Sequence, residues 1–199
     1  MSIFCCFENC FRQLNPGLAP PRPVRRRVPS ISIDASQTGQ EVVIIKNGTR
    51  ICGSGAALAS IPILQDKAYF EVKIQQGGIW GVGLATERAD VNRIPLGDDN
   101  ESWVICSDNV VRHNGIDVAK PSISSQEGDT LGIAYDHVQL NFYLNGKNME
   151  CPISGIRGTI FPAFYVDDGA ILDTHFRNFQ QEPPVGYGEI MAEKSILEA

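Results

Sequence analysis

The sequence is poor in the residues and motifs from which catalytic centres are usually built. Only three of its 199 residues are histidines, and His113, His137 and His175 stand far apart in the chain. A Gly-x-Ser-x-Gly nucleophile elbow, a glycine-rich phosphate loop and a His-Glu-x-x-His zinc motif are all missing. We therefore expect no catalytic residues, no cofactor and no metal site, and we predict that the protein is not an enzyme.

The sequence also lacks a long hydrophobic run. No segment approaches the roughly 20 apolar residues that a membrane-spanning helix needs. The opening MSIFCCF has neither the basic n-region nor the apolar core of a signal peptide. We therefore expect a cytoplasmic protein whose six cysteines stay reduced.

Basic residues are scarce outside the N-terminal segment. Residues 1–30 carry five arginines and one glutamate, a balance of +4. The rest of the chain carries 12 basic and 22 acidic side chains, a balance of −10, and the two parts give the net charge of −6. An acidic body lacks the basic surface that phosphate neutralisation requires, so we expect no nucleic-acid partner. The acidity serves either solubility or the binding of a basic partner segment.

What the sequence does contain is a regular alternation of apolar side chains. Between residues 127 and 147 the pattern has a period of two, which places one apolar face on two short strands. We expect Asp136–His137 to form the turn between them and Asn145–Gly146 to form a second turn, because Asn-Gly tolerates positive φ. The apolar positions are Leu131, Ile133 and Tyr135 in the first strand and Val138, Leu140, Phe142 and Leu144 in the second.

Short apolar runs separated by turn residues occur along most of the chain. Nineteen glycines and twelve prolines suit many turns, and the spacing is typical of a β-sandwich rather than of βαβ units. Residues 42–45 and 49–52 flank Asn47–Gly48 as an early hairpin. Trp80 and Trp103 lie in apolar segments, where we expect them to pack inside the protein.

The length and the distribution of prolines indicate one domain with two tails. We place the domain at residues 30–180, the N-terminal tail at residues 1–29 and the C-terminal tail at residues 181–199. In the C-terminal tail we expect one or two helical turns, with Ile190 and Leu197 available to dock.

Several segments together resemble the SPRY domain family. Residues 127–147 read EGDTLGIAYDHVQLNFYLNGK, and an EGD turn followed by LGIAYD and FYLNGK is similar to the central signature of these domains. The other family-like segments stand in the family's order: YFEVKI (69–74), GIWGVGLAT (78–86), LGDDNESW (96–103), the turn His113–Asn114–Gly115, and GTIFPAFYVDDG (158–169).

This resemblance implies a non-catalytic, protein-binding fold. The expected architecture is a bent antiparallel β-sandwich of two sheets, concanavalin-like, with a flexible N-terminal tail. The family binds partner segments through loops at one edge of the sandwich, where a rigid scaffold positions them. The corresponding residues here are Asn47, Arg50, Arg88, Asn92, Arg93, Ile94, Val166, Asp167, Asp168 and Gly169.

The last of these loops departs from the family pattern. Members that capture acidic, Asn-containing segments carry Val-Trp-Gly here and an aromatic residue in the middle connection. This chain reads Val166-Asp167-Asp168-Gly169 and has no aromatic residue between Arg88 and Ile94. Asp168 stands where the tryptophan would be, so we expect an adaptor whose protein partner presents Lys or Arg to this loop.

A lectin-like sandwich that binds calcium or carbohydrate is the alternative. The carboxylates of Asp98, Asp99, Asp167 and Asp168 are oxygen ligands of the kind that calcium prefers. The sequence has no loop with regularly spaced ligands, so this alternative rests on residue type alone.

Three cysteines lie among apolar residues near the N-terminus. Cys5, Cys6 and Cys10 stand beside phenylalanines, and a cluster of arginines follows within residues 22–27. This combination favours reversible S-acylation assisted by anionic lipid, because one acyl chain alone holds a membrane only marginally. Acylation would make the protein partly membrane-associated. Incidental thiols in a flexible tail are the alternative, as is a zinc site, for which three cysteines without a nearby histidine are an incomplete set.

Overall fold

The computed structural model describes residues 30–192; the N-terminal tail and residues 193–199, including Leu197, lie outside the described part. All regular structure in residues 30–192 is β-strand, which confirms the all-β prediction. No helix suited to crossing a membrane occurs in this range. In chain order the strands are β1 (Ile33–Thr38), β2 (Glu41–Ile45), β3 (Arg50–Ala59), β4 (Ala68–Gln76), β5 (Ile79–Thr86), β6 (Ser102–Cys106), β7 (Val111–His113), β8 (Ile116–Ala119), β9 (Thr130–Tyr135), β10 (Gln139–Leu144), β11 (Lys147–Asn148), β12 (Ile153–Ser154), β13 (Ile160–Asp167) and β14 (Ile171–His175).

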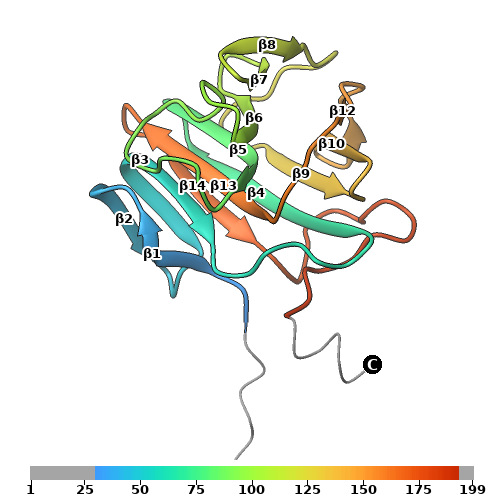
Figure 1. Ribbon diagram of the computed structural model, residues 1–199, viewed down its shortest axis with the longest axis horizontal. Coiled ribbons are helices and arrows are strands. Elements are labelled where there is room, and N and C mark those ends of the chain that lie inside the picture. The colour runs from blue at the N-terminus through green and yellow to red at the C-terminus, as the bar shows by residue number, and fades with distance from the viewer. Residues whose placement is uncertain (1–29, 193–199) are drawn as a thin grey trace, which may run out of the picture.

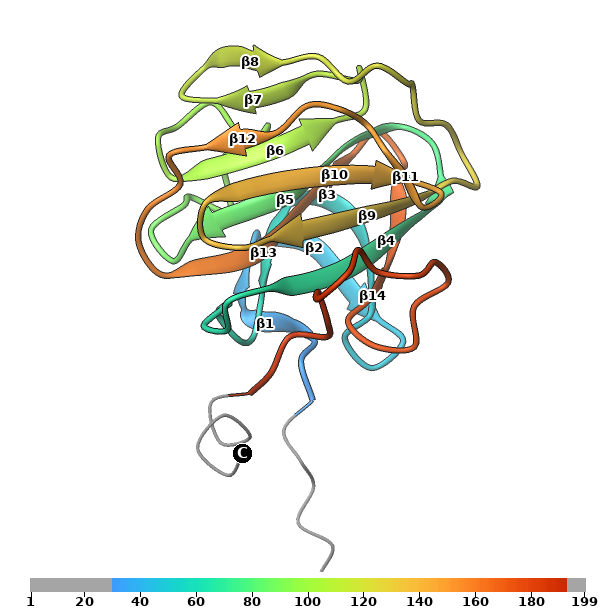
Figure 2. The same ribbon diagram turned by 90° about the vertical axis from the view of Figure 1, so that its right-hand side faces the viewer.

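The strands form an antiparallel sheet that curls into two facing halves (Figure 1). Their order is β11-β10-β9-β4-β14-β3-β13-β5-β6-β7-β8, with β1 and β2 on β3 and β12 on β10. We call the part around β4, β9 and β10 the β4 half and the part around β5, β6 and β13 the β5 half. Figure 2 looks onto the β4 half, and both figures show the described ends of the chain leaving side by side at one end.

Strand β3 joins the two halves, and glycines allow it to do so. Its first residues pair with β2 and β14, and its last residues pair with β1 and β13. Between these parts, Gly53 and Gly55 have φ of 94° and 133°, which glycine adopts at little cost. A Cβ at Gly53 would lie 2.2 Å from a backbone oxygen of β2. The opposite strand is interrupted at the same level, because β13 ends beside Gly55 and β14 begins beside Ile51.

The turns expected from the sequence are confirmed. Asp136–His137 joins β9 to β10, and the Asp136 carboxylate accepts backbone hydrogen bonds from Val138 and Gln139 at 3.0 and 2.7 Å. Asn145–Gly146 joins β10 to β11 with positive φ at both residues. Residues 46–49 join β2 to β3.

The main hydrophobic core lies between the two halves of the sheet. Its centre contains Phe70 of β4, Phe164 of β13 and Phe176, whose ring centroids lie 6.0–6.2 Å apart, the spacing of favourable aromatic pairs. Trp80 and Trp103 belong to the same cluster with only 3% and 6% of their surface exposed. The prediction that both tryptophans are core residues is confirmed.

The outer face of the β5 half carries a second apolar cluster. Leu58, Val104 and Tyr165 point to this side of β3, β6 and β13. The connection between β5 and β6 crosses the face, and its residues Leu96 and Ile94 pack on the cluster. Burial of apolar surface thus fixes a long connection against the sheet.

The C-terminal segment covers the outer face of the β4 half (Figure 2). Glu71 of β4 is completely buried, and its carboxylate accepts hydrogen bonds from the backbone N–H groups of Gln180 and Gln181 at 2.7 and 2.9 Å and from the Tyr69 hydroxyl at 3.1 Å. Ile190 is buried against the domain. The expected helical turns are wrong for residues 181–192, which are extended or in turns. Their hydrogen bonds go to the domain instead of to a helix.

We predict that Glu71→Gln lowers the free energy of unfolding by about 1–3 kcal/mol, because one buried acceptor is replaced by a donor that faces backbone N–H groups. The C-terminal segment should also become susceptible to limited proteolysis. Urea unfolding and mass spectrometry of the fragments measure both effects, and the exposed Glu182→Gln is the matched control. Equal stability and equal cleavage in the two variants would contradict this role of Glu71.

Candidate functional site

The connection between β5 and β6 meets the turn between β1 and β2 at one edge of the β5 half. The carbonyl oxygen of Val91 accepts a hydrogen bond from the backbone N–H of Ala56 at 2.9 Å. The side-chain oxygen of Asn92 accepts one from the backbone N–H of Gln40 at 3.0 Å. Ile94 follows, joined to Pro95 by a cis peptide bond. The Asn92–Gln40 hydrogen bond therefore joins the connection to the β1–β2 turn, and the Val91–Ala56 hydrogen bond joins it to β3.

The turn between β13 and β14 lies at the same edge. Asp167 is the last residue of β13 and pairs with Ile79 of β5. The turn continues through Asp168 and Gly169, both with positive φ, and closes with a hydrogen bond from the Ala170 N–H to the Asp167 carbonyl oxygen at 3.0 Å. Asp167 is half-buried and Asp168 is exposed. The two neighbouring carboxylates thus have different surroundings.

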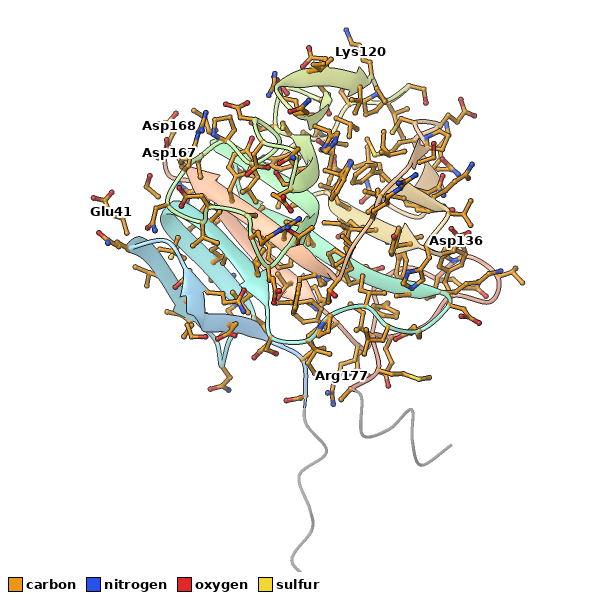
Figure 3. All side chains as sticks on the ribbon, in the orientation of Figure 1. Glu41, Lys120, Asp136, Asp167, Asp168 and Arg177 are labelled. Carbon is orange, nitrogen blue, oxygen red and sulfur yellow. The ribbon has the colours of Figure 1, made fainter. Side chains whose placement is uncertain are left out.

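Two adjacent hollows open between these segments, and together we call them the edge groove. The Asn92 hollow has a volume of about 440 Å³ and is mainly polar; it is lined by Gly39, Gln40, Glu41, Ser54, Gly55, Asn92 and Ile94. The Tyr165 hollow has a volume of about 360 Å³ and is mainly apolar; it is lined by Ile79, Ile94, Pro95, Cys106, Ser107, Asp108, Arg112, Tyr165 and Asp167. Ile94 borders both. Figure 3 shows Glu41, Asp167 and Asp168 on the same side of the molecule.

The floor of the Tyr165 hollow is electrically neutral at neutral pH. Burial raises the pKa of the Cys106 thiol and that of the Tyr165 hydroxyl, so both groups keep their protons. Such a thiol is a poor nucleophile.

Arg112 lies in the wall of this hollow, but its charge is compensated. Its guanidinium donates to the carboxylate of Asp108 and, at 3.1 Å, to that of Asp117. The hydrogen bond to Asp108 raises the pKa of Arg112 above its usual value. The hollow therefore has a paired cation in its wall and the carboxylate of Asp167, which has no ion-pair partner within residues 30–192, at its rim.

The structure brings together only some of the residues expected at the binding surface. Asn92 and Ile94 line the groove with Asp167, and Asp168 and Gly169 lie in the adjoining turn. The remaining expected residues, Asn47, Arg50, Arg88, Arg93 and Val166, line neither hollow.

The residues that line neither hollow lie in other surroundings. Arg88 pairs with Glu101 at 3.1 Å, and Arg93 is exposed. Asn47 is exposed in the turn between β2 and β3. Val166 is completely buried in the main core.

Arg50 belongs to an ion-pair group in the β4 half. Its guanidinium donates twice to the carboxylate of Asp173 in β14, at 2.5 and 2.8 Å, and Lys46 donates to the same carboxylate at 3.0 Å. Burial alone would raise the pKa of Asp173, but the hydrogen bonds from Arg50 and Lys46 outweigh it and hold the pKa below its ordinary value. Arg50 is thus bound within the protein.

Several groove residues were not identified from the sequence. Gly39, Gln40 and Glu41 form the turn between β1 and β2, and Ile79 and Tyr165 come from two paired strands. The only local signal was a turn-forming Thr-Gly-Gln before the predicted strand at residue 42. That signal indicates a turn but carries no information about which distant loop the turn meets.

No group of three or more His, Cys, Asp or Glu side chains in residues 30–192 is arranged to hold a metal ion. Asp98 and Asp99, considered above as calcium ligands, lie in the connection between β5 and β6. Asp99 instead accepts hydrogen bonds from the backbone N–H of Glu101 at 3.0 Å and from the Ser102 hydroxyl at 2.7 Å. Through these contacts the Asp99 carboxylate stabilises the local turn.

Comparison with known sequences and structures gives concordant results. The family model described as SPRY domain matches residues 67–179. SPRY domain-containing protein 7 of Homo sapiens and that of Bos taurus are each 49% identical to the chain over 198 residues. The match covers 98% of this chain and 98% of each relative. Among solved structures, the SPRY domain of human HERC1 superposes with a TM-score of 0.61 at 14% identity and covers 75% of this chain and 100% of that one. The TRIM65 PSpry domain gives 0.60 at 14% identity, with 73% and 89% covered. At these identities the structural likeness shows the fold alone.

We predict that Asp173→Asn lowers the melting temperature by roughly 3–6 °C at neutral pH, the size expected for a loss of one to two kcal/mol in a domain of this length. Because the folded-state pKa of Asp173 is depressed, its charge stabilises the fold above the unfolded-state pKa, and that stabilisation is lost as the pH falls through the folded-state value. The difference between native protein and variant should therefore shrink below about pH 4. Thermal melts across this range measure it, and a difference independent of pH would contradict the ion-pair role.

Proposed function

The chain belongs to the SPRY domain family, whose members are generally protein-interaction modules, and from this premise we propose that it is a non-enzymatic adaptor that binds a short segment of a partner protein in the edge groove. The resemblance inferred from the sequence motifs and the bent antiparallel sandwich are confirmed. The binding of a particular segment, and its place on the molecule, are our proposal.

The observation that carries this proposal is the pair of hollows that share Ile94. Three loop regions line them: the β1–β2 turn, the connection between β5 and β6, and the β6–β7 turn with Ser107 and Asp108. Asp167, at the end of β13, adds a residue next to the β13–β14 turn. Binding groups are commonly placed on loops that a rigid scaffold positions, and concave sites with a few polar groups are the usual form of a recognition site. A shallow groove of two hollows suits an extended peptide better than a globular surface.

The charge at this edge favours a basic partner segment. Glu41 and Asp167 each line one hollow, and Asp168 is exposed beside them. Opposite charges across an interface promote association and suppress binding of like-charged competitors. A segment that carries Lys or Arg would complement these carboxylates.

We predict that Ile79→Arg abolishes binding of the protein partner, because its guanidinium repels a basic segment and its long side chain obstructs the Tyr165 hollow. Ile79 is 46% exposed, so the fold should lose little stability. Ile116→Arg is the matched control: Ile116 is 61% exposed on β8, in the same half of the sheet but outside the groove. Proximity labelling in cells, with a thermal melt of each protein, measures both effects.

The expected result is a set of labelled proteins that is lost with Ile79→Arg and kept with Ile116→Arg, at nearly equal melting temperatures. If both variants label the same proteins as the native chain, the groove is not the binding surface. If Ile79→Arg melts far below the control, Asp167→Lys provides a second obstruction, because the Asp167 side chain makes no hydrogen bond or ion pair within residues 30–192.

We further propose that the protein is cytoplasmic and partly recruited to membranes through its N-terminal cysteines. Cys5, Cys6 and Cys10 lie outside the described residues, so the support is the sequence alone: thiols among apolar side chains, followed by arginines. Two acyl chains, or one chain with a basic cluster, are enough for stable attachment.

We expect acyl-exchange labelling of the native protein in cells, and a membrane fraction that falls when Cys5, Cys6 and Cys10 are all replaced by Ser, because the acceptor thiols are removed. Replacement of Cys52, Cys106 and Cys151 by Ser is the control, since the latter two are buried and all three lie in the domain. Equal labelling of native protein and N-terminal variant would leave the incidental-thiol interpretation.

A further inference from the structure

We propose that the Tyr165 hollow receives a single Lys or Arg side chain of an extended partner segment, while the Asn92 hollow receives an amide or hydroxyl side chain from the same face of that segment. This inference rests on the proposed function and specifies its ligand: a cationic residue and a neutral polar residue that lie on either side of Ile94.

The lining of the Tyr165 hollow suits the aliphatic part of a long basic side chain. Ile79, Ile94 and Pro95 form apolar walls. Lys and Arg bury their methylene groups along such surfaces and keep the charged end in a polar environment. A short or purely polar side chain would leave the apolar surface of these walls exposed to water.

The charges around the hollow select for a cation. The Asp167 carboxylate stands at the rim without an ion-pair partner among the described residues, whereas the Arg112 guanidinium is engaged by both Asp108 and Asp117. The lining thus carries two carboxylates, Asp108 and Asp167, and one guanidinium, which Asp117 from outside the hollow also pairs with. An incoming anion would meet an excess of negative charge, and an incoming cation would neutralise part of it.

The floor of the hollow adds no opposing charge. Cys106 and Tyr165 are buried and both remain neutral at neutral pH, so neither repels a cation. The hydroxyl of Tyr165 and the sulfur of Cys106 are also weak to moderate acceptors for N–H donors. The hollow therefore combines apolar walls, a neutral floor and a carboxylate rim.

The Asn92 hollow offers donors and acceptors at the same time. The side-chain oxygen of Asn92 is occupied by the backbone N–H of Gln40, which leaves its NH₂ group as a donor. Glu41 is exposed and supplies acceptors, and the Ser54 hydroxyl supplies either function. A side chain that both donates and accepts, such as Asn, Gln, Ser or Thr, matches this set.

An extended segment places alternate side chains on one face, roughly 6–7 Å apart. Because the two hollows share Ile94 as their common border, alternate residues of one strand-like segment would enter them in turn. The inference therefore specifies a pattern with one spacer residue between the cation and the neutral polar residue.

The test is selection of a random-peptide display library on the full-length chain and on three variants. Asp167→Asn removes the rim charge and nearly preserves the shape of the side chain. Asp66→Asn is the matched control, because Asp66 is exposed, makes no hydrogen bond or ion pair within the described part of the chain, and lines neither hollow. Ile79→Arg obstructs the Tyr165 hollow and places a competing cation in it.

The native chain and Asp66→Asn should enrich Lys or Arg at one position and Asn, Gln, Ser or Thr two residues away. Asp167→Asn should still select peptides, with its preference for the cation reduced about tenfold, the effect of losing one partner of a charge pair. Ile79→Arg should select none of these peptides.

Two results would overturn the inference and are distinguishable from each other. If the native chain selects peptides without a basic position, and Ile79→Arg abolishes their selection, the groove binds peptides but the cation assignment is wrong. If Ile79→Arg selects the same peptides as the native chain, the binding surface lies elsewhere, and the proposed function fails together with this inference.

Discussion

The backbone pairing of β3 with both halves of the sheet is the constraint on which the rest of the structure depends. One continuous strand contributes hydrogen bonds to β14 and β2 at its start and to β13 and β1 at its end, so the two halves separate at β3 only if its pairing with one of them is broken. The change of partner occurs at Gly53 and Gly55, and Gly55 itself lines the Asn92 hollow. The strand opposite is interrupted at the same level, where Asp167 and Asp168 form a turn. The groove thus lies where the sheet bends, and the bend is fixed by main-chain hydrogen bonds rather than by side-chain packing alone.

Both outer faces of the sandwich are covered by segments of the chain, by different physical means. The connection between β5 and β6 is held on one face by apolar burial, with Leu96 fully inside the second cluster. The C-terminal segment is held on the other face mainly by a polar anchor, the buried carboxylate of Glu71 that accepts two backbone N–H groups. Such an anchor is favourable only while all its partners are in place. Apolar burial therefore holds one segment on the sheet, and buried hydrogen bonds hold the other.

Local features of the sequence were sufficient to predict much of the fold but little of the candidate site. The turn at Asn145–Gly146 and the alternation at Leu140, Phe142 and Leu144 depend on neighbouring residues, so they could be predicted and are confirmed. Val138 was expected on the same apolar face, but it lies in the turn before β10 and is 68% exposed. The meeting of Gln40 with Asn92 depends on how the whole sheet curls, and no local pattern encodes it. Arg50 was expected at the binding surface, but its partner Asp173 lies 123 residues further along the chain. The helical turns expected in the C-terminal tail were wrong for residues 181–192, because the domain supplies hydrogen-bond partners that an isolated segment would have to find within itself.

The two described ends of the chain leave the sandwich side by side (Figures 1 and 2). When a domain with adjacent ends is inserted into another polypeptide, the path of the receiving chain hardly changes. Adjacent ends therefore permit domain insertion and circular permutation. A tether joined to either described end of this domain would therefore hold it from nearly the same place.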